Sequence, residues 1–395
     1  MLVEHDMTDS TLQSFNHFKD AYQRRIGQLL AHRKDGKKIV GTFCLFVPDE
    51  IIYAAGADRV ILCGGRNATV SLAEEYLPRT ICPLIKSSFG SVVSMECCEV
   101  VEACPHFDLV DMVVAEATCD GKKKMYEFLN QYIPTYVIDL PQKLEDPEAL
   151  RYYRGELEKF KAAMERLTGS TVTDETLRRE IRSANETRRL LHRLYDLRRR
   201  DPPPVMGVDV LKVLQKQYFL SPEDFRTPLR ELCDEAEQLP TEGRHTPRIM
   251  ISGCPMAGGN TKVPNIIEER GGIIVVEESC TGTRSFWDLV DEDQNKDPLT
   301  AIAERYLKIP CSCMTPNERR IEHIRELVET FKVDGVVYYT LQSCHGYNIE
   351  KFKVQQALKR AHVPMLAIET DYSDSDVGQI EVRVDAFMEM IASSP

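Results

Sequence analysis

The sequence predicts an α/β fold in which two similar open parallel sheets are joined by a helical insertion and preceded by an N-terminal helix. Short apolar runs alternate with helical periodicity in two separate parts of the chain, as buried parallel strands alternate with helices. A charged stretch of helical period lies between them. We therefore divide the 395 residues into an N-terminal helical segment (1–35), a first α/β domain (36–145), a helical domain (146–245) and a second α/β domain (246–395).

The N-terminal segment is expected to form an amphipathic helix over residues 10–35 that packs across the first α/β domain. Its apolar side chains recur at helical spacing at Leu12, Phe15, Phe18, Tyr22, Ile26 and Leu29. The residues before it lack the basic start and apolar core of a secretory signal peptide. A cytoplasmic location is therefore expected.

In the first α/β domain, short apolar runs alternate with helical ones. They occupy residues 38–46, 48–56, 58–65, 109–119 and 134–140. The pattern changes near Asp146, where a highly charged stretch of helical period begins. One apolar stripe runs along it through Leu177, Ile181, Leu190, Leu191, Leu194 and Leu197. The prolines at 202–204 end that helix, and the second α/β domain begins near Arg248.

The two α/β domains resemble distant repeats of each other. Residues 110–114 have a counterpart at 333–337, and residues 133–139 are echoed by 363–369. Each domain is therefore expected to form an open parallel sheet of the Rossmann or flavodoxin type. Ligands of such sheets bind beyond the carboxyl ends of the strands.

Cysteines repeat with the fold. Cys44 and Cys254 each close a first strand, and Cys119 and Cys344 follow equivalent later runs. Cys82 and the pair Cys311 and Cys313 each follow a mid-domain segment. Two similar sheets that face each other would bring three thiolates from each domain to one shared cleft. Soft thiolates in such numbers favour an iron-sulfur centre.

Other interpretations of the thirteen cysteines are less favoured. A disulfide framework requires an oxidising compartment, which the missing signal peptide argues against. Zinc sites use close cysteine pairs, and only Cys311 and Cys313 are close. The compact runs of small ferredoxins are missing. We interpret four cysteines as small buried hydrophobes, namely Cys63, Cys97, Cys98 and Cys233.

Charge and hydropathy exclude two classes of partner. A formal net charge of −12 argues against nucleic acid, because phosphate binding needs clustered Lys and Arg. No apolar stretch is long enough to span a membrane.

Several motifs around these cysteines give a specific resemblance. They are Gly41–Cys44, Cys82–Ser88, Thr118–Lys124, Ser252–Met256, Glu278–Gly282, Cys311–Cys313, Gln342–His345 and Ile368–Ser373. In this order, and across essentially the whole chain, they resemble the 2-hydroxyacyl-CoA dehydratase family. Within it the pattern is most similar to the double-cubane cluster proteins, in which two bridged cubanes (8Fe-9S) are held by six cysteines.

The resemblance implies a ligand set. Dehydratase subunits carry one 4Fe-4S cluster on three cysteines, which correspond here to Cys82, Cys119 and Cys344. For a double cubane three further ligands are needed. We choose Cys44, Cys254 and Cys313, because the cysteines repeat between the two α/β domains. Cys280 and Cys311 are the next candidates.

It also implies an activator, an ATP-hydrolysing homodimer with its own 4Fe-4S cluster that delivers low-potential electrons. This chain has no G-x-x-x-x-G-K-[ST] loop for ATP. A homodimer is expected here as well. Candidate proton donors are His345, Glu278 and Glu369, because a reductase needs a proton for each electron passed to its substrate.

Three functions follow. The first is a reductase of small unsaturated molecules at a double cubane. The second is a subunit of a 2-hydroxyacyl-CoA dehydratase with one 4Fe-4S cluster, which removes water from a thioester. The third is a non-enzymatic electron-transfer module. The matched extra cysteines favour the first.

Overall fold

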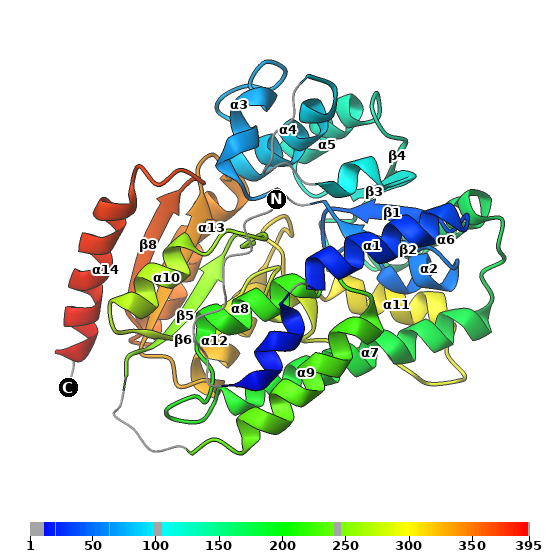
Figure 1. The fold of residues 1–395 in the computed structure, drawn as a ribbon. Coiled ribbons are helices and arrows are strands. Elements are labelled where there is room, and N and C mark those ends of the chain that lie inside the picture. The colour runs from blue at the N-terminus through cyan, green and yellow to red at the C-terminus, as the bar shows by residue number, and fades with distance from the viewer. Residues whose placement is uncertain (1–11, 20, 63, 98–104, 241–245, 394–395) are drawn as a thin grey trace.

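The computed structural model describes residues 12–393 except 20, 63, 98–104 and 241–245. Its strands form two separate four-stranded parallel sheets. The first contains β1 (Ile39–Thr42), β2 (Asp58–Ile61), β3 (Met112–Glu116) and β4 (Thr135–Ile138), in the order β2-β1-β3-β4. The second contains β5 (Arg248–Gly253), β6 (Ile273–Glu278), β7 (Gly335–Leu341) and β8 (Met365–Thr370), in the order β6-β5-β7-β8. The predicted α/β class with two similar parallel sheets is confirmed (Figure 1).

The matching strand order explains the repeats in the sequence. β3 and β7 occupy equivalent positions, as do β4 and β8 at the edges. The central strands β5 and β7 are buried along their whole length, whereas β4 and β8 include exposed residues. Strands covered on both faces are apolar throughout, which is why these segments read as continuous apolar runs.

Helices of the first α/β part connect its strands. They are α2 (Asp49–Ala54), α3 (Val70–Ala73), α4 (Pro83–Cys97) and α5 (Asp120–Leu129), with short 3-10 turns η2 (Asn67–Thr69) and η3 (Pro105–Asp108). The second part has α10 (Lys262–Glu269), η4 (Thr283–Ser285), α11 (Pro298–Leu307), α12 (Glu318–Thr330), α13 (His345–Arg360) and α14 (Val377–Ala392).

The N-terminal segment differs from the predicted single helix. It forms a 3-10 turn, η1 (Gln13–Phe18), followed by the helix α1 (Ala21–Lys34), because the backbone turns into an extended conformation at Lys19. The 3-10 turn η1 and the helix α1 pack into different cores. Phe15 and Phe18 pack into the core of the helical insertion, whereas Leu29 packs into the core of the first sheet.

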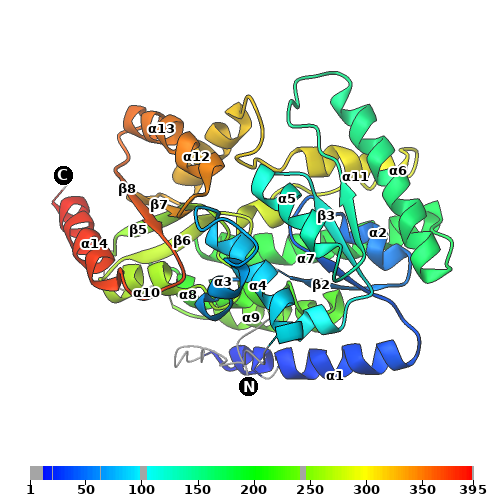
Figure 2. The same cartoon turned by 90° about the horizontal axis from the view of Figure 1, so that it is seen from above.

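The described residues of the insertion form four helices: α6 (Ala149–Thr168), α7 (Asp174–Leu197), α8 (Gly207–Lys216) and α9 (Pro222–Glu237). Thr173 begins α7 by accepting the backbone N–H of Thr176, and α9 begins similarly at Ser221. The predicted apolar stripe of α7 is buried at both ends. Ile181 packs with residues around the first sheet, and Leu194 packs with residues around the second. The insertion therefore fixes the two sheets relative to each other (Figure 2).

No helix in the part of the chain that the structure describes is both long and apolar enough to cross a membrane.

Candidate metal centre

A cavity of about 600 Å³ lies between the two α/β parts and is lined by cysteines from both. The thiols along its wall are those of Cys44, Cys82, Cys119, Cys280, Cys311, Cys313 and Cys344. Three of them come from the first α/β part and four from the second. Five of the six ligands predicted from the sequence therefore line one cavity, together with both of the next candidates.

The local structure explains why these thiols converge. Cys44 and Cys280 each lie two residues beyond a strand, after β1 and β6 respectively. Cys82 directly precedes α4, and Cys119 and Cys344 are the N-cap residues of α5 and α13. Carboxyl ends of parallel strands meet at one edge of a sheet, and helices begin there. The positive end of a helix dipole stabilises thiolates and the anionic cluster they would hold.

Thiol contacts divide the cysteines into two groups. In the first, hydrogen bonding between Cys82 and Cys344 raises the pKa of Cys82, and hydrogen bonding with Cys254 raises that of Cys344. Cys119 is an electrostatic neighbour of Cys82. We call Cys82, Cys119, Cys254 and Cys344 the helix-cap group, and it combines residues of both α/β parts.

The second group consists of Cys44, Cys280, Cys311 and Cys313, which we call the loop group. Hydrogen bonding with Cys44 lowers the pKa of Cys280, and hydrogen bonding with Cys313 lowers the pKa of Cys311 to about 6. Electrostatic interaction also links Cys280 to Cys311. Cys44 is the member from the first α/β part, so this group likewise spans both.

Cys254 differs from the other members. It is 1% exposed and does not line the cavity, and its Sγ accepts the backbone N–H of Leu341 at 3.4 Å. Cys280 and Cys311 do line the cavity. Replacing Cys254 by one of them gives three cavity thiols in the helix-cap group and three in the loop group.

The donor set suits a cluster of several metals. Among the described residues, no three His, Cys, Asp or Glu side chains converge closely enough to hold one metal ion. Donors for a cluster instead surround a volume, as these thiols do. Thiolates are the soft ligands that iron-sulfur clusters use, so the residues present fit such a group.

A buried arginine lies beside the loop group. Arg284 is 2% exposed, with its Nη1 3.9 Å from Cys280 Sγ and its Nε 2.5 Å from Glu278 Oε1. It also donates to the hydroxyl of Tyr347, which lies 4.0 Å from Cys311 Sγ. This arrangement directs a guanidinium and a phenol at two thiols, and such neighbours tune a cluster.

Sequence reasoning missed Arg284 and Tyr347. A signal was available, because Arg284 lies four residues after Cys280 and Tyr347 lies three residues after Cys344, on the first turn of α13. Arg284 lies near the thiol of Cys280, which precedes it, whereas the Tyr347 hydroxyl lies near Cys311, and the sequence does not reveal that neighbour.

The three candidate proton donors have different surroundings. His345 is exposed and lines the cavity. Glu278 is completely buried and does not line it; despite this burial, Arg284 and Arg320 lower its pKa to about 2, so it holds no proton at neutral pH. Glu369 lies on β8, outside the cavity lining, and accepts a hydrogen bond from Asn348. Of the three, the structure thus brings only His345 to the thiols.

The structure also places the lysines within two of the cysteine motifs and the cysteines interpreted as buried hydrophobes. Lys122 and Lys123 line the cavity, whereas Lys86 is directed at Glu74 with an N–O distance of 2.8 Å. Cys233 is fully buried in α9, as predicted for a small hydrophobe. Cys63 and Cys98 lie outside the described residues, as does the side chain of Cys97.

Comparison with known protein families identifies the family of the chain. The family model described as 2-hydroxyglutaryl-CoA dehydratase, D-component, matches residues 44–391. The chain belongs to this family. The matched range contains every cysteine of both groups.

Individual relatives match over nearly their full length. The putative dehydratase subunit YjiM of Escherichia coli is 38% identical, covering 95% of this chain and 97% of the relative. The (R)-phenyllactyl-CoA dehydratase beta subunit of Clostridium sporogenes is 22% identical over 95% and 98%. A benzoyl-CoA reductase subunit of Thauera aromatica is 23% identical over 90% and 91%. The relatives are thus named as subunits of dehydratases and of a reductase.

Proposed function

We propose that this protein is an iron-sulfur reductase that holds a double-cubane cluster and reduces small unsaturated molecules at low potential. The observation that carries the proposal is the number and grouping of thiols around one cavity. A single 4Fe-4S cluster held on three cysteines would use fewer than half of the seven cavity thiols. Two groups that each offer three or more thiols match two cubanes.

The ligands of one cubane would be Cys82, Cys119 and Cys344, which also correspond to the dehydratase cysteines. The loop group would supply three of its four thiols to the other. This revises the set of six by placing Cys280 or Cys311 in the position given to Cys254, because Cys254 lies behind the cavity wall.

When bound, the cluster would supply low-potential electrons to a substrate. The chain's own residues surround that chemistry with a cavity between the two α/β parts, with Arg284 and Tyr347 near two thiols and with His345 as a proton source at its edge. An ATP-hydrolysing activator with its own 4Fe-4S cluster would deliver the electrons, and the protein would act as a homodimer.

A second candidate is supported by the relatives. Several are named as dehydratase subunits, and a chain that works with an unlike subunit would hold one 4Fe-4S cluster on Cys82, Cys119 and Cys344. The loop group would then hold no metal.

Metal analysis decides between the two. Anaerobically prepared protein is expected to contain about eight irons and nine acid-labile sulfides per chain, with an EPR signal after reduction. About four irons would favour the dehydratase subunit, and zinc or no metal would contradict both.

A variant tests the loop group directly. The triple variant Cys44→Ser, Cys280→Ser, Cys311→Ser should lose about half of the iron, because one cubane then keeps a single thiol of the loop group. Cys233→Ser is the matched control, since Cys233 is buried in α9 and outside the cavity. Full iron in the triple variant would contradict the proposal.

A further inference from the structure

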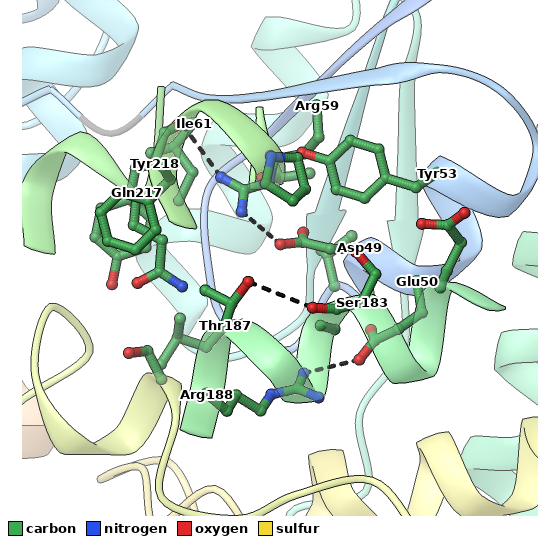
Figure 3. A pocket seen from close by; sticks show the side chains of 18 of the residues that line it. Asp49, Glu50, Tyr53, Arg59, Ile61, Ser183, Thr187, Arg188, Gln217 and Tyr218 are labelled. Atoms are coloured by element: carbon green, nitrogen blue, oxygen red, sulfur yellow. Dashed lines mark hydrogen bonds and ion pairs between the residues drawn. The ribbon is translucent and has the colours of Figure 1, made fainter. Parts of the chain in front are cut away.

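A second, smaller cavity lies behind Cys44, on the side that faces the helical insertion. We call it the inner chamber. It has a volume of about 80 Å³ and is lined by residues of α2, α7 and the segment after α8 (Figure 3). Ordered water needs about 10–15 Å³ of such volume per molecule, so several waters fit.

Its wall combines apolar side chains, such as Leu220 and Phe225, with a set of polar and charged ones. Arg188 donates to Glu50 at 2.8 Å, and Tyr306 donates to the same carboxylate at 2.7 Å. Arg59 pairs with Asp49 elsewhere on the wall (Figure 3). An apolar cavity of this size would stay dry, whereas a polar one holds water.

Two residues of the wall each have a buried polar atom that lacks a hydrogen-bond partner among the described residues. Arg59 is 6% exposed, and its Nε has no hydrogen-bond partner within the described part of the chain. The buried Oε1 of Gln217 likewise has none there. One is a donor and the other an acceptor. Water in the chamber would supply both missing partners, because a water molecule can accept from the guanidinium and donate to the amide.

The inner chamber shares a wall with the thiol-lined cavity. Cys44, Leu45, Ile61 and Tyr218 line both. The chamber also reaches half-buried side chains at its outer side, including Asp49 and Glu180. It thus extends from partly solvated carboxylates to the back of a candidate cluster ligand.

We propose that the inner chamber is a water-filled route that supplies protons to the thiol-lined cavity. This inference rests on the proposed reductase function, because reducing a double or triple bond consumes one proton for each electron. With acetylene as a probe, two electrons and two protons convert one molecule to ethylene. The route would carry protons from Asp49 and Glu180 along the chamber's waters, while the substrate occupies the larger cavity.

The test blocks the chamber without touching a thiol. Ala184 lies on α7 and lines the chamber, so Ala184→Leu should fill part of it. Ala162→Leu is the matched control, because Ala162 is a partly buried residue of α6 that lines neither cavity. Iron content is measured first, then acetylene reduction with titanium(III) citrate as the electron donor, in H₂O and in D₂O.

We expect Ala184→Leu to keep its iron and its rate of cluster reduction but to form ethylene about tenfold more slowly, with a larger solvent isotope effect. Gln217→Leu, which removes the acceptor, should act in the same direction and serves if Ala184→Leu does not fold. Wild-type rates and isotope effects in both variants would overturn the proton route alone. A wild-type protein with a full cluster that never reduces acetylene would overturn the proposed function and the route together.

A high-resolution crystal structure provides a test that needs no substrate. Ordered waters bonded to Arg59 Nε and Gln217 Oε1 are the expected result. A dry chamber, or one occupied by an anion or an organic molecule, would overturn the proposal.

Discussion

Gly253, the last residue of β5, shows how a single position shapes the fold next to the centre. Its φ of +139° is unfavourable for residues with a side chain, and a Cβ there would lie 1.9 Å from the carbonyl oxygen of Tyr339 on β7. Backbone cannot move away as a flexible side chain would. Only glycine therefore lets the chain leave β5 and turn to Cys254.

Gly253→Ala is expected to lower the free energy of unfolding by about 3 kcal/mol or more, because it adds backbone strain and a clash between neighbouring strands. Chemical denaturation measures this.

Gly155→Ala is the control. Gly155 lies within α6 with open space around its missing Cβ, so alanine should stabilise the protein by up to about 1 kcal/mol. Equal effects of the two substitutions would contradict the argument.

At this scale, the sequence identified the cysteines but not their grouping. Thiol positions at the ends of apolar runs are visible in a sequence because strands end there. Whether Cys254 or Cys280 lines a cavity depends on where each loop packs, and the alternating pattern of a strand does not encode this.

At the scale of elements, Asp58 at the start of β2 holds α1 in place. Its carboxylate accepts from Arg25 at 3.0 Å and lies 2.7 Å from the ring nitrogen of His32. Lys37 is a third partner at 3.1 Å. Although burial favours the neutral acid, the charges of Arg25 and Lys37 and the hydrogen bond with His32 hold the pKa of Asp58 below its ordinary value.

The pH dependence follows from that direction. Asp58 stabilises the folded protein at pH values above its unfolded pKa of about 3.9, and this contribution is lost as the pH falls through the lower folded pKa. Asp58→Asn should cost about 3 kcal/mol at pH 7, because Arg25 stays buried without its charge partner, and less as the pH approaches 3. Urea denaturation across this range measures the difference.

Asp35→Asn is the control, since Asp35 is exposed just beyond α1. A cost for Asp58→Asn that does not change with pH would contradict the electrostatic explanation.

The elements were largely predictable. The strands and the helical insertion follow from apolar periodicity, which reports burial directly. The break of the N-terminal helix at Lys19 was not predictable, because the apolar spacing continues through it. The chain turns there since the residues before and after Lys19 pack into two different cores.

At the scale of the whole molecule, the candidate centre joins parts that are distant in the chain. Both thiol groups combine residues of the two α/β parts, so a bound cluster would connect the two sheets. Without the cluster, only the surrounding side chains and the helical insertion would hold the two sheets together.

Loss of the cluster is therefore expected to lower the free energy of unfolding by about 3 kcal/mol or more, because a ligand bound only by the folded state stabilises that state. Thermal denaturation of cluster-loaded and chelator-treated protein under nitrogen measures this. Identical melting temperatures, with iron shown to be present in one sample and absent from the other, would contradict a cluster held between the sheets.

The same distribution of thiols has a consequence for biosynthesis. During translation Cys44, Cys82 and Cys119 leave the ribosome long before Cys280 and Cys344. Cys44 belongs to the loop group, whereas Cys82 and Cys119 belong to the helix-cap group. The loop group has been synthesised once Cys313 is made, but the set of Cys82, Cys119 and Cys344 is complete only after β7 has been made. We therefore expect cofactor insertion to follow folding, and the cell's cluster assembly machinery to act on a finished protein whose cavity is still accessible.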